Sequence, residues 1–223
     1  MRLYLIGKTK YPSVTTILEV ISKPGLMYYY GKHGTQKAIL LANKSRIIGN
    51  RLHKYIEYDC QGKAKQYYDL LKSKGKLETT KKSGKKLQDM MNQYLTFKTI
   101  YQFKPLLSEE TIHSRTYFYA GTVDSIGTIV HQEKQLLLIT DWKSSGKVYD
   151  EYLLQTVAYL KAYEEMNSDK HLDGVCCVSF NKELLDRNPD IKIVTDKAQL
   201  DEMFEVFLCA LKLYNWKERR GNG

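Results

Sequence analysis

The chain has 223 residues, of which 43% are hydrophobic, and this composition is sufficient to build the core of a folded domain. Its formal net charge of +10 favours a polyanion, such as nucleic acid, over an acidic small substrate. No apolar stretch approaches the roughly 20 residues that a membrane span needs, and the N-terminal apolar run is too short for a secretory signal. We therefore expect no membrane partner and an intracellular, non-secreted protein, in the cytoplasm or nucleoid, or in the host cell if the protein is viral.

The N-terminal segment predicts a short helix followed by a break. The stretch YPSVTTILEVIS (11–22) indicates a turn and then a helix that Ser13 caps, because Ser is a preferred N-cap residue. The next segment, KPGLMYYYGKHG (23–34), contains one proline and three glycines. These residues commonly interrupt helices, so we expect an irregular connection here.

A long helix is predicted from about residue 36 to residue 60. Its apolar residues recur every four positions, as in Ile48, Leu52 and Ile56. Beside this stripe, His53 and Glu57 have the same spacing and project from one face of the helix. A single His in this position is also typical of a core histidine with satisfied hydrogen bonds, and the helix alone leaves both interpretations open.

A lysine-rich stretch follows the long helix. Between residues 61 and 104 there are eleven lysines and three acidic residues, and the run KKSGKK occupies positions 81–86. Such a run is typical of a solvated loop, but its lysines are also candidates for contacts with the phosphates of a nucleic acid. The four candidates are Lys81, Lys82, Lys85 and Lys86. A further helix is predicted over residues 86–101.

The pattern then changes to strands. TIHSRTYFYAGTVDSIGTIV (111–130) and QLLLITDWK (135–143) are separated by the polar connection HQEK. If the turn is centred between residues 132 and 133, the numbers of facing residues sum to 265, which places Asp124 opposite Asp141. Two facing carboxylates repel each other unless a positive group lies between them, and a cation is the simplest candidate. Because side chains alternate along a strand, Lys143 shares the face of Asp141.

The last third of the chain predicts a helix, two strands and a closing helix. The helix over 148–166 presents apolar residues to the sheet, while Gln155 and Tyr159 form an i, i+4 pair on another face. DGVCCVSFN (173–181) and DIKIVT (190–195) indicate strands, and residues 198–220 have a strong apolar helical face.

The four cysteines have no C-x-x-C spacing. They stand at positions 60, 176, 177 and 209. We expect buried core thiols without a disulfide framework, while an iron–sulfur or zinc site remains the alternative if the fold gathers all four.

Four residues form a chemically coherent set, namely His53, Asp124, Asp141 and Lys143. Carboxylates, an imidazole and the backbone carbonyl of Trp142 are suitable ligands for Mg²⁺ or Mn²⁺. Such a metal polarises a phosphoryl oxygen and lowers the pKa of a bound water. Lys143 would orient that water or balance charge in the transition state. The sequence therefore predicts hydrolysis of phosphodiester bonds.

Five segments, in order, resemble the RecB-like branch of the PD-(D/E)XK nuclease superfamily. They are PSVTTIL with KPGL, GNRLHKYIE, a Glu ahead of YAGTVD, ITDWKSS, and LLQTVAYLKAY with its Gln-x-x-x-Tyr motif. The resemblance covers most of the chain and extends to the mitochondrial genome maintenance exonuclease and to phage and archaeal exonucleases. It implies an α/β fold with a restriction-endonuclease-like core, in which helices flank a central mixed β-sheet, and a helical N-terminal half.

The resemblance also assigns roles to residues. It implies a single nuclease domain over 1–223, with a mainly helical, DNA-handling part (1–105) and a sheet-containing catalytic core (106–223). The metal ligands would be His53, Asp124, Asp141 and the carbonyl of Trp142. The catalytic residues would be Asp124, Asp141 and Lys143. The supporting residues would be Glu57, Glu109, Gln155 and Tyr159, and Tyr159 would also contact DNA. Relatives with an iron–sulfur cluster have one cysteine ahead of the His motif and three near the C-terminus. Here Cys60 follows His53, so we expect no cluster.

The leading hypothesis is a Mg²⁺- or Mn²⁺-dependent DNA exonuclease that acts on single-stranded ends or flaps in replication, repair or recombination, with proteins of those processes as further partners. No G-x-x-x-x-G-K-[ST] motif is present, so the chain has no built-in helicase motor. Two alternatives stay open: a structure-specific endonuclease with the same site, and a catalytically silent DNA-binding subunit.

Overall fold

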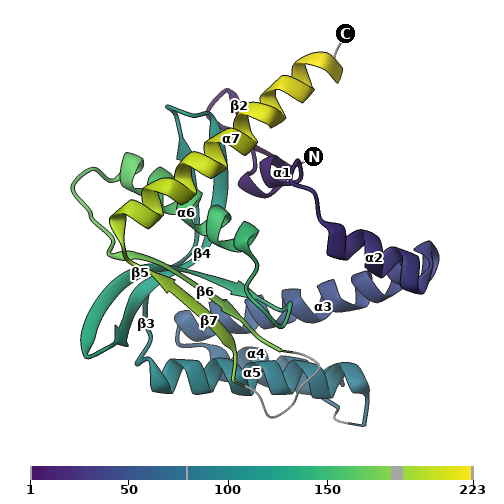
Figure 1. Cartoon of the computed structure of the whole chain (residues 1–223). Helices are drawn as coiled ribbons and strands as arrows, with labels where there is room; N and C mark the ends of the chain where they lie inside the picture. The colour runs from purple at the N-terminus through teal and green to yellow at the C-terminus, as the bar shows by residue number, and fades with distance from the viewer. Residues whose placement is uncertain (1, 79, 182–187, 222–223) are drawn as a thin grey trace.

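A mixed five-stranded sheet forms the centre of the protein (Figure 1). The computed structural model describes residues 2–78, 80–181 and 188–221. The strands lie in the order β3-β4-β5-β6-β7, where only β5 and β6 are parallel neighbours. Their bounds are β3 Lys104–Ser114, β4 Tyr119–His131, β5 Lys134–Lys143, β6 Gly174–Ser179 and β7 Asp190–Val194. The chain is therefore an α/β protein with a mixed sheet, as the sequence predicts.

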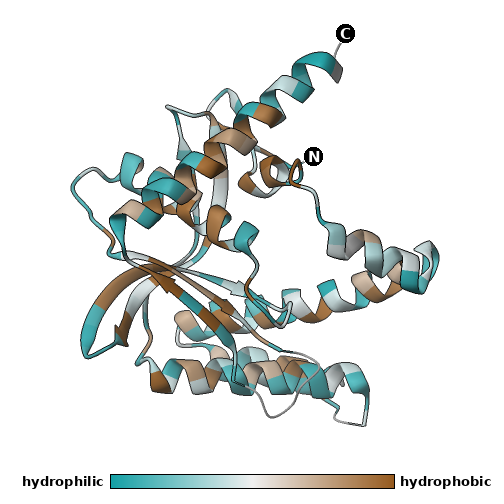
Figure 2. Cartoon of the chain, viewed as in Figure 1, coloured by the Kyte–Doolittle hydropathy of each residue, from teal (hydrophilic) through white to brown (hydrophobic). Residues whose placement is uncertain are grey.

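Helices cover both faces of this sheet. In the described residues there are seven: α1 Val14–Leu18, α2 Pro24–His33, α3 Thr35–Cys60, α4 Ala64–Ser73, α5 Lys82–Ile100, α6 Asp150–Met166 and α7 Lys197–Gly221. One apolar cluster joins the sheet to α1, α6 and α7, and a second joins it to α3, α4 and α5. Figure 2 shows hydrophobic residues along the central strands, between these two layers. None of the helices in the described ranges is long and apolar enough to cross a membrane.

The β4–β5 hairpin has the predicted register. Its pairs run from Ser125–Thr140 to His131–Lys134, and all of them sum to 265. The turn residues Gln132 and Glu133 have φ values of 49° and 63°, which are the positive values that a tight two-residue hairpin requires. Side chains along β5 also alternate between the two faces of the sheet, since the neighbours Leu138 and Ile139 belong to different apolar clusters.

The N-terminal region is more regular than expected. Ser13 caps α1 as predicted, because its Oγ accepts a 3.0 Å hydrogen bond from the amide of Thr16. The predicted irregular connection over 23–34 is wrong, since α2 begins at Pro24 and continues to His33. Proline is well tolerated in the first turn of a helix, where its missing N–H would have no partner. A short hairpin of β1 (Leu3–Ile6) and β2 (Thr9–Pro12) precedes these helices.

Helix also replaces much of the expected lysine-rich loop. Residues 64–73 form α4, and α5 begins at Lys82 rather than near Lys86. α4 carries an apolar side that packs on α3 through residues such as Leu71 and Tyr67. The high lysine content masked this amphipathic pattern in the sequence.

The cysteines agree only partly with the expectation of core thiols. Cys176 and Cys177 are buried in β6, on opposite sides of the sheet, because one belongs to the cluster with α3–α5 and the other to the cluster with α6 and α7. Cys60 is half-buried at the end of α3, whereas Cys209 is exposed on α7. Exposure of Cys209 contradicts the prediction for that residue, since it lies on the solvent side of an amphipathic helix.

Candidate active site

Asp124 and Asp141 lie side by side where the β4–β5 ladder ends. The last printed pair of this ladder is Ser125–Thr140, and the two aspartates occupy the next positions. The backbone amide of Trp142 donates a 2.8 Å hydrogen bond to Asp124 Oδ2, which holds this carboxylate against β5. The hairpin register therefore brings together the two acids that the sequence pairs.

Lys143 and Gln155 surround the carboxylate of Asp141. Asp141 is only 1% exposed, and Lys143 Nζ lies 2.8 Å from its Oδ2 and 2.9 Å from its Oδ1. The side-chain amide of Gln155 donates to Asp141 Oδ1 at 3.0 Å and to the Tyr159 hydroxyl at 3.1 Å. Lys143 in turn donates to Gln155 Oε1 at 3.4 Å. A network of hydrogen bonds thus fixes the carboxylate and the ammonium relative to each other.

The charges of Asp141, Lys143 and Asp124 shift one another's pKa values. Burial raises the pKa of Asp141 to about 6, because the nearby Lys143 only partly offsets burial and the Asp124 charge adds to it. Burial also opposes the charge on Lys143, but Asp141 and Asp124 outweigh it and raise the pKa of Lys143. For Asp124, burial is outweighed by His53 and Lys143, so the pKa of Asp124 falls below its usual value.

His53 faces Asp124 from α3. Its Nδ1 lies 3.5 Å from Asp124 Oδ1, and its side chain is 31% exposed, which separates it from a fully buried core histidine. Burial lowers the pKa of His53, but the Asp124 carboxylate has the larger combined effect and raises it overall. The structure therefore brings His53 to the two carboxylates, as the sequence predicts.

Glu57 and Glu109 lie at the edge of this group. Glu57 is engaged by Lys54, whose Nζ is 2.7 Å from its Oε1. Partial burial, together with the charges of Asp124 and Glu57, raises the pKa of Glu109. Glu109 has a φ of 56° within β3, a left-handed conformation that is uncommon for a residue other than glycine.

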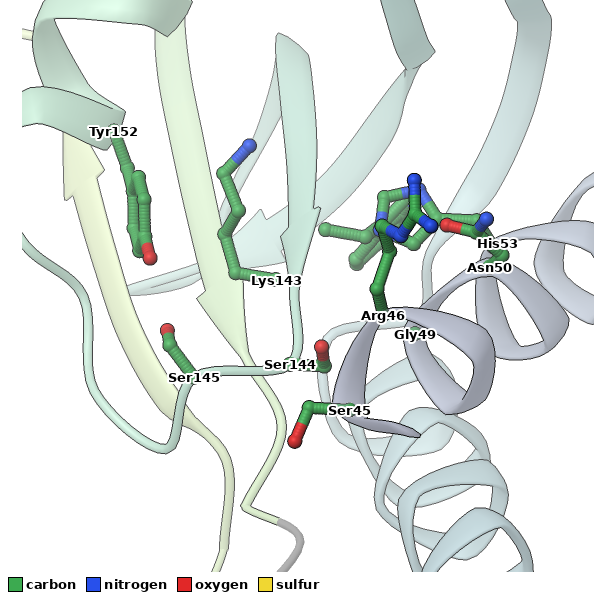
Figure 3. Close-up of a pocket in the computed structure, with 10 residues that line it drawn as sticks. Ser45, Arg46, Gly49, Asn50, His53, Lys143, Ser144, Ser145 and Tyr152 are labelled. Atoms are coloured by element: carbon green, nitrogen blue, oxygen red, sulfur yellow. The ribbon is translucent and has the colours of Figure 1, made fainter. Parts of the chain in front are cut away.

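A pocket of about 310 Å³ opens beside Lys143 (Figure 3). One wall comes from α3 and the other from the end of β5 and the residues after it. Its lining includes Ser45, Arg46, Gly49, Asn50, His53, Trp142, Lys143, Ser144, Ser145 and Tyr152. An added Cβ at Gly49 would lie 2.9 Å from Ser144 Oγ, so glycine permits the close approach of the two walls.

Sequence analysis missed several of these lining residues. Arg46 and Asn50 precede His53 by seven and three positions, a spacing that places all three on one face of α3 and could have revealed them. Tyr152 has its ring centroid 5.0 Å from Lys143 Nζ, and no sequence motif indicates that contact.

The four predicted DNA-contacting lysines do not line this pocket. Lys81 precedes α5 and forms a 2.6 Å ion pair with Glu78, while Lys82, Lys85 and Lys86 lie in the first turns of α5. This lysine cluster therefore lies outside the lining of the pocket.

The donor types suit a hard divalent metal, although no ligand cage is preformed. Across residues 2–78, 80–181 and 188–221, no three His, Cys, Asp or Glu side chains are grouped so that they could hold a metal ion. However, buried Asp141 Oδ2 receives no hydrogen bond in that part of the chain, although Lys143 Nζ is at ion-pair distance. Mg²⁺ commonly binds one or two carboxylates, waters and substrate phosphates rather than an all-protein cage, so Asp124 and Asp141 fit it.

Comparison with known proteins adds no assignment: no family model matches the chain, and no curated protein matches it.

Proposed function

We propose that this chain is a metal-dependent deoxyribonuclease, an exonuclease of the RecB-like branch that hydrolyses phosphodiester bonds at single-stranded ends or flaps. The proposal includes a single nuclease domain with a restriction-endonuclease-like core and a role in replication, repair or recombination. One observation carries it: buried Asp141 is ion-paired with Lys143 and stands beside Asp124 at the end of two neighbouring strands. Burial of negative charge is costly, so two neighbouring carboxylates that share Lys143 as their permanent counter-charge favour a function that uses them with a further cation.

Each residue has a distinct part in this proposal. Asp124 and Asp141 would hold Mg²⁺ or Mn²⁺, with His53 and the carbonyl of Trp142 as further ligands. When bound, the metal would polarise the phosphoryl group and lower the pKa of a water. Lys143 has a raised pKa, so it stays protonated near neutral pH and serves as a fixed positive charge for the developing phosphorane rather than as a base. Gln155 holds both the Asp141 carboxylate and the Lys143 ammonium in position.

A catalytically silent DNA-binding module is the second candidate. The Asp141–Lys143 ion pair supports it, because the ammonium neutralises the buried carboxylate without a metal. A structure-specific endonuclease would use the same residues as the exonuclease, so only the geometry of the substrate separates those two activities.

Digestion of end-labelled linear single-stranded DNA beside a circular single strand tests these candidates. The reactions contain Mg²⁺, Mn²⁺ or EDTA, and compare the wild type with Asp141→Ala and with Asp69→Ala, the matched change of an exposed acid on α4. We expect metal-dependent loss of the linear strands alone in the wild type and Asp69→Ala, and none in Asp141→Ala.

Other outcomes contradict the exonuclease. Cutting of the circle identifies an endonuclease, and binding without any cutting identifies the silent module. Equal cutting by Asp141→Ala would remove Asp141 from the catalytic set. The end from which label is first released gives the polarity.

A further inference from the structure

A long segment without any acidic residue, residues 20–56, leads to the pocket. This segment, here called the basic arm, contains α2 and most of α3, with five lysines, two arginines and no Asp or Glu. All five lysines are exposed; Lys54 pairs with Glu57, which leaves Lys23, Lys32, Lys37 and Lys44. None of these four takes part in an ion pair with a residue in the described ranges. The positive charge of these four lysines is therefore available to an external anion.

Exposed apolar and aromatic side chains alternate with these lysines. Met27 and Tyr28 on α2 are each 73% exposed, and Leu40 on α3 is 61% exposed. Ile39 and Ile47 extend the same character along α3. A surface that only had to remain solvated would not need large apolar groups between its lysines. The combination instead matches what an unpaired strand offers, namely phosphates for the lysines and base faces for the apolar and aromatic side chains.

The basic arm leads directly into the pocket. Figure 1 shows α2 and the first half of α3 projecting to one side of the sheet, whereas the second half of α3 passes beneath it. Arg46, Asn50 and His53, on successive turns of α3, line the pocket beside Lys143 (Figure 3). The Arg46 guanidinium is exposed, and its hydrogen bond to Asn43 is long, at 3.5 Å. Helix α3 thus connects the exposed Lys37 and Lys44 to His53, which faces Asp124, and α2 with Lys32 precedes it across Gly34.

We propose that the basic arm is the docking surface for single-stranded nucleic acid and that Arg46 holds a phosphate next to the bond that Lys143 faces. The inference rests on the proposed function in one respect, namely that the bound strand runs along the arm toward Asp124 and Asp141. The binding itself depends only on the arm. The arm itself contains no acidic residue, and of its lysines only Lys54, at its end, pairs with an acid in the described ranges, Glu57. A surface with positive charge alone favours a polyanion over a peptide that carries charges of both signs.

Binding of a labelled oligodeoxythymidylate in EDTA, measured by fluorescence anisotropy over a range of salt concentrations, tests the arm without cleavage. The test variant is Lys32→Ala/Lys37→Ala/Lys44→Ala. Its matched control is Lys197→Ala/Lys212→Ala/Lys217→Ala, which removes the same charge from α7 on the other face of the sheet. We expect the arm variant to bind about tenfold or more weakly, with a salt slope reduced by about two, since each phosphate contact on a single strand contributes roughly 0.7. The control should retain wild-type binding within about twofold.

Tyr28→Ala tests the stacking part of the proposal. It should weaken binding of the strand roughly five- to tenfold while leaving the salt slope unchanged, because stacking on a base releases no counterions. Arg46→Gln should weaken binding and reduce the slope by about 0.7. Unchanged circular dichroism and melting temperature show that each variant is folded.

Several outcomes would overturn the inference. Equal losses in the arm and α7 variants would mean that only net charge matters. Tighter arm-dependent binding to phosphatidylserine vesicles than to the oligonucleotide would identify a membrane surface instead. If the wild type cleaves DNA but the arm variant binds normally, the inference fails and the proposed function stands. If binding depends on the arm but no cleavage occurs, the inference stands and the nuclease proposal fails.

Discussion

The backbone amide of Trp142 donates a 2.8 Å hydrogen bond to the carboxylate of Asp124, so β4 and β5 stay joined beyond their last ladder pair. This bond gives Asp124 a structural task as well as a proposed metal-binding one. The two tasks can be separated, because an asparagine keeps an acceptor oxygen for the amide but has no charge.

Asp124→Asn should therefore retain the fold and lose cleavage, whereas Asp124→Leu should lose both the charge and the acceptor. We expect Asp124→Leu to be about 1–3 kcal/mol less stable than Asp124→Asn, which is the usual cost of a buried amide without a partner. Urea unfolding in EDTA measures this difference. Equal stability of the two variants would show that the Trp142 amide finds another acceptor.

The Asp141–Lys143 pair should show strong coupling in stability. Lys143→Met leaves the carboxylate of Asp141 buried and without its counter-charge, and such removal of one partner commonly costs about 3–5 kcal/mol. Asp141→Asn/Lys143→Met removes both charges and should recover most of that loss. A double-mutant cycle by urea unfolding checks the prediction, and simple additivity of the single changes would contradict it.

Two glycine replacements should have opposite effects on the free energy of unfolding. A Cβ at Gly121 would lie 2.2 Å from Cε1 of Tyr159, so Gly121→Ala should displace this ring and destabilise the protein by about 1–3 kcal/mol. Gly31 lies inside α2 with no atom near an added Cβ, and Gly31→Ala should stabilise by roughly 0.5–1 kcal/mol. Thermal unfolding of the two variants gives the comparison, and a shared sign would contradict it.

Glu165 should make stability depend on acid pH. Burial opposes its charge, but hydrogen bonds from the Ser114 hydroxyl and from the amides of Thr116 and Arg115 outweigh burial and lower its pKa below the ordinary 4.5. A folded-state pKa below the unfolded one means that the stabilisation is complete above about 4.5 and is lost as the pH falls through the lowered value.

Glu165→Gln should consequently be less stable than the wild type at neutral pH, and the difference between them should shrink as the pH falls below 4.5. Glu110→Gln, the same change at an exposed acid of β3, serves as the control. Urea unfolding over an acid pH series makes the measurement. If the difference in the free energy of unfolding stays constant with pH, the packing of the side chain at position 165, rather than its charge, stabilises the β3–β4 turn.

A charge reversal at the start of α5 distinguishes an effect on stability from an effect on DNA binding. Lys82 is the first residue of this helix, where a positive charge opposes the helix dipole, and the first turn of α5 contains no acidic residue. Lys82→Glu should stabilise the helix by roughly 0.3–1 kcal/mol. If the run over 81–86 contacts DNA, the same change should also weaken binding of the strand; if the run is only solvated surface, thermal stability should rise and binding should change no more than in Lys217→Glu on α7.

Local patterns in the sequence predict those features of the fold that depend only on residues close together along the chain. The hairpin register could be predicted because the two-residue turn at Gln132 and Glu133 fixes every pair that follows it. The Ser13 cap and the face shared by Asp141 and Lys143 also depend on neighbours in sequence. Helix α2 could not be predicted in this way, because Pro24 breaks helices in general and is accommodated only at the first turn.

The arrangement of the pocket depends on contacts between distant segments. Tyr152 meets Lys143 only because α6 packs beside the end of β5, and Ser144 approaches Gly49 only because α3 crosses beneath the sheet. Spacing along α3 identifies His53, which also belongs to a motif, whereas Arg46 and Asn50 share its face but have no motif of their own. Residues 61–104 contain more lysines, eleven, than the basic arm, which contains five. The basic arm differs from that stretch because it contains no acidic residue.

The adjacent thiols of β6 allow the two halves of the core to be followed separately during unfolding. Cys176 faces the layer of α3–α5 and Cys177 faces the layer of α6 and α7, and burial raises the pKa of both thiols. With Cys60 and Cys209 replaced by serine, a variant that retains only one of the two thiols reports by alkylation rate when its own layer opens. Different rates for the two single-thiol proteins would show that one layer detaches from the sheet first, and equal rates would show that both open in a single cooperative event.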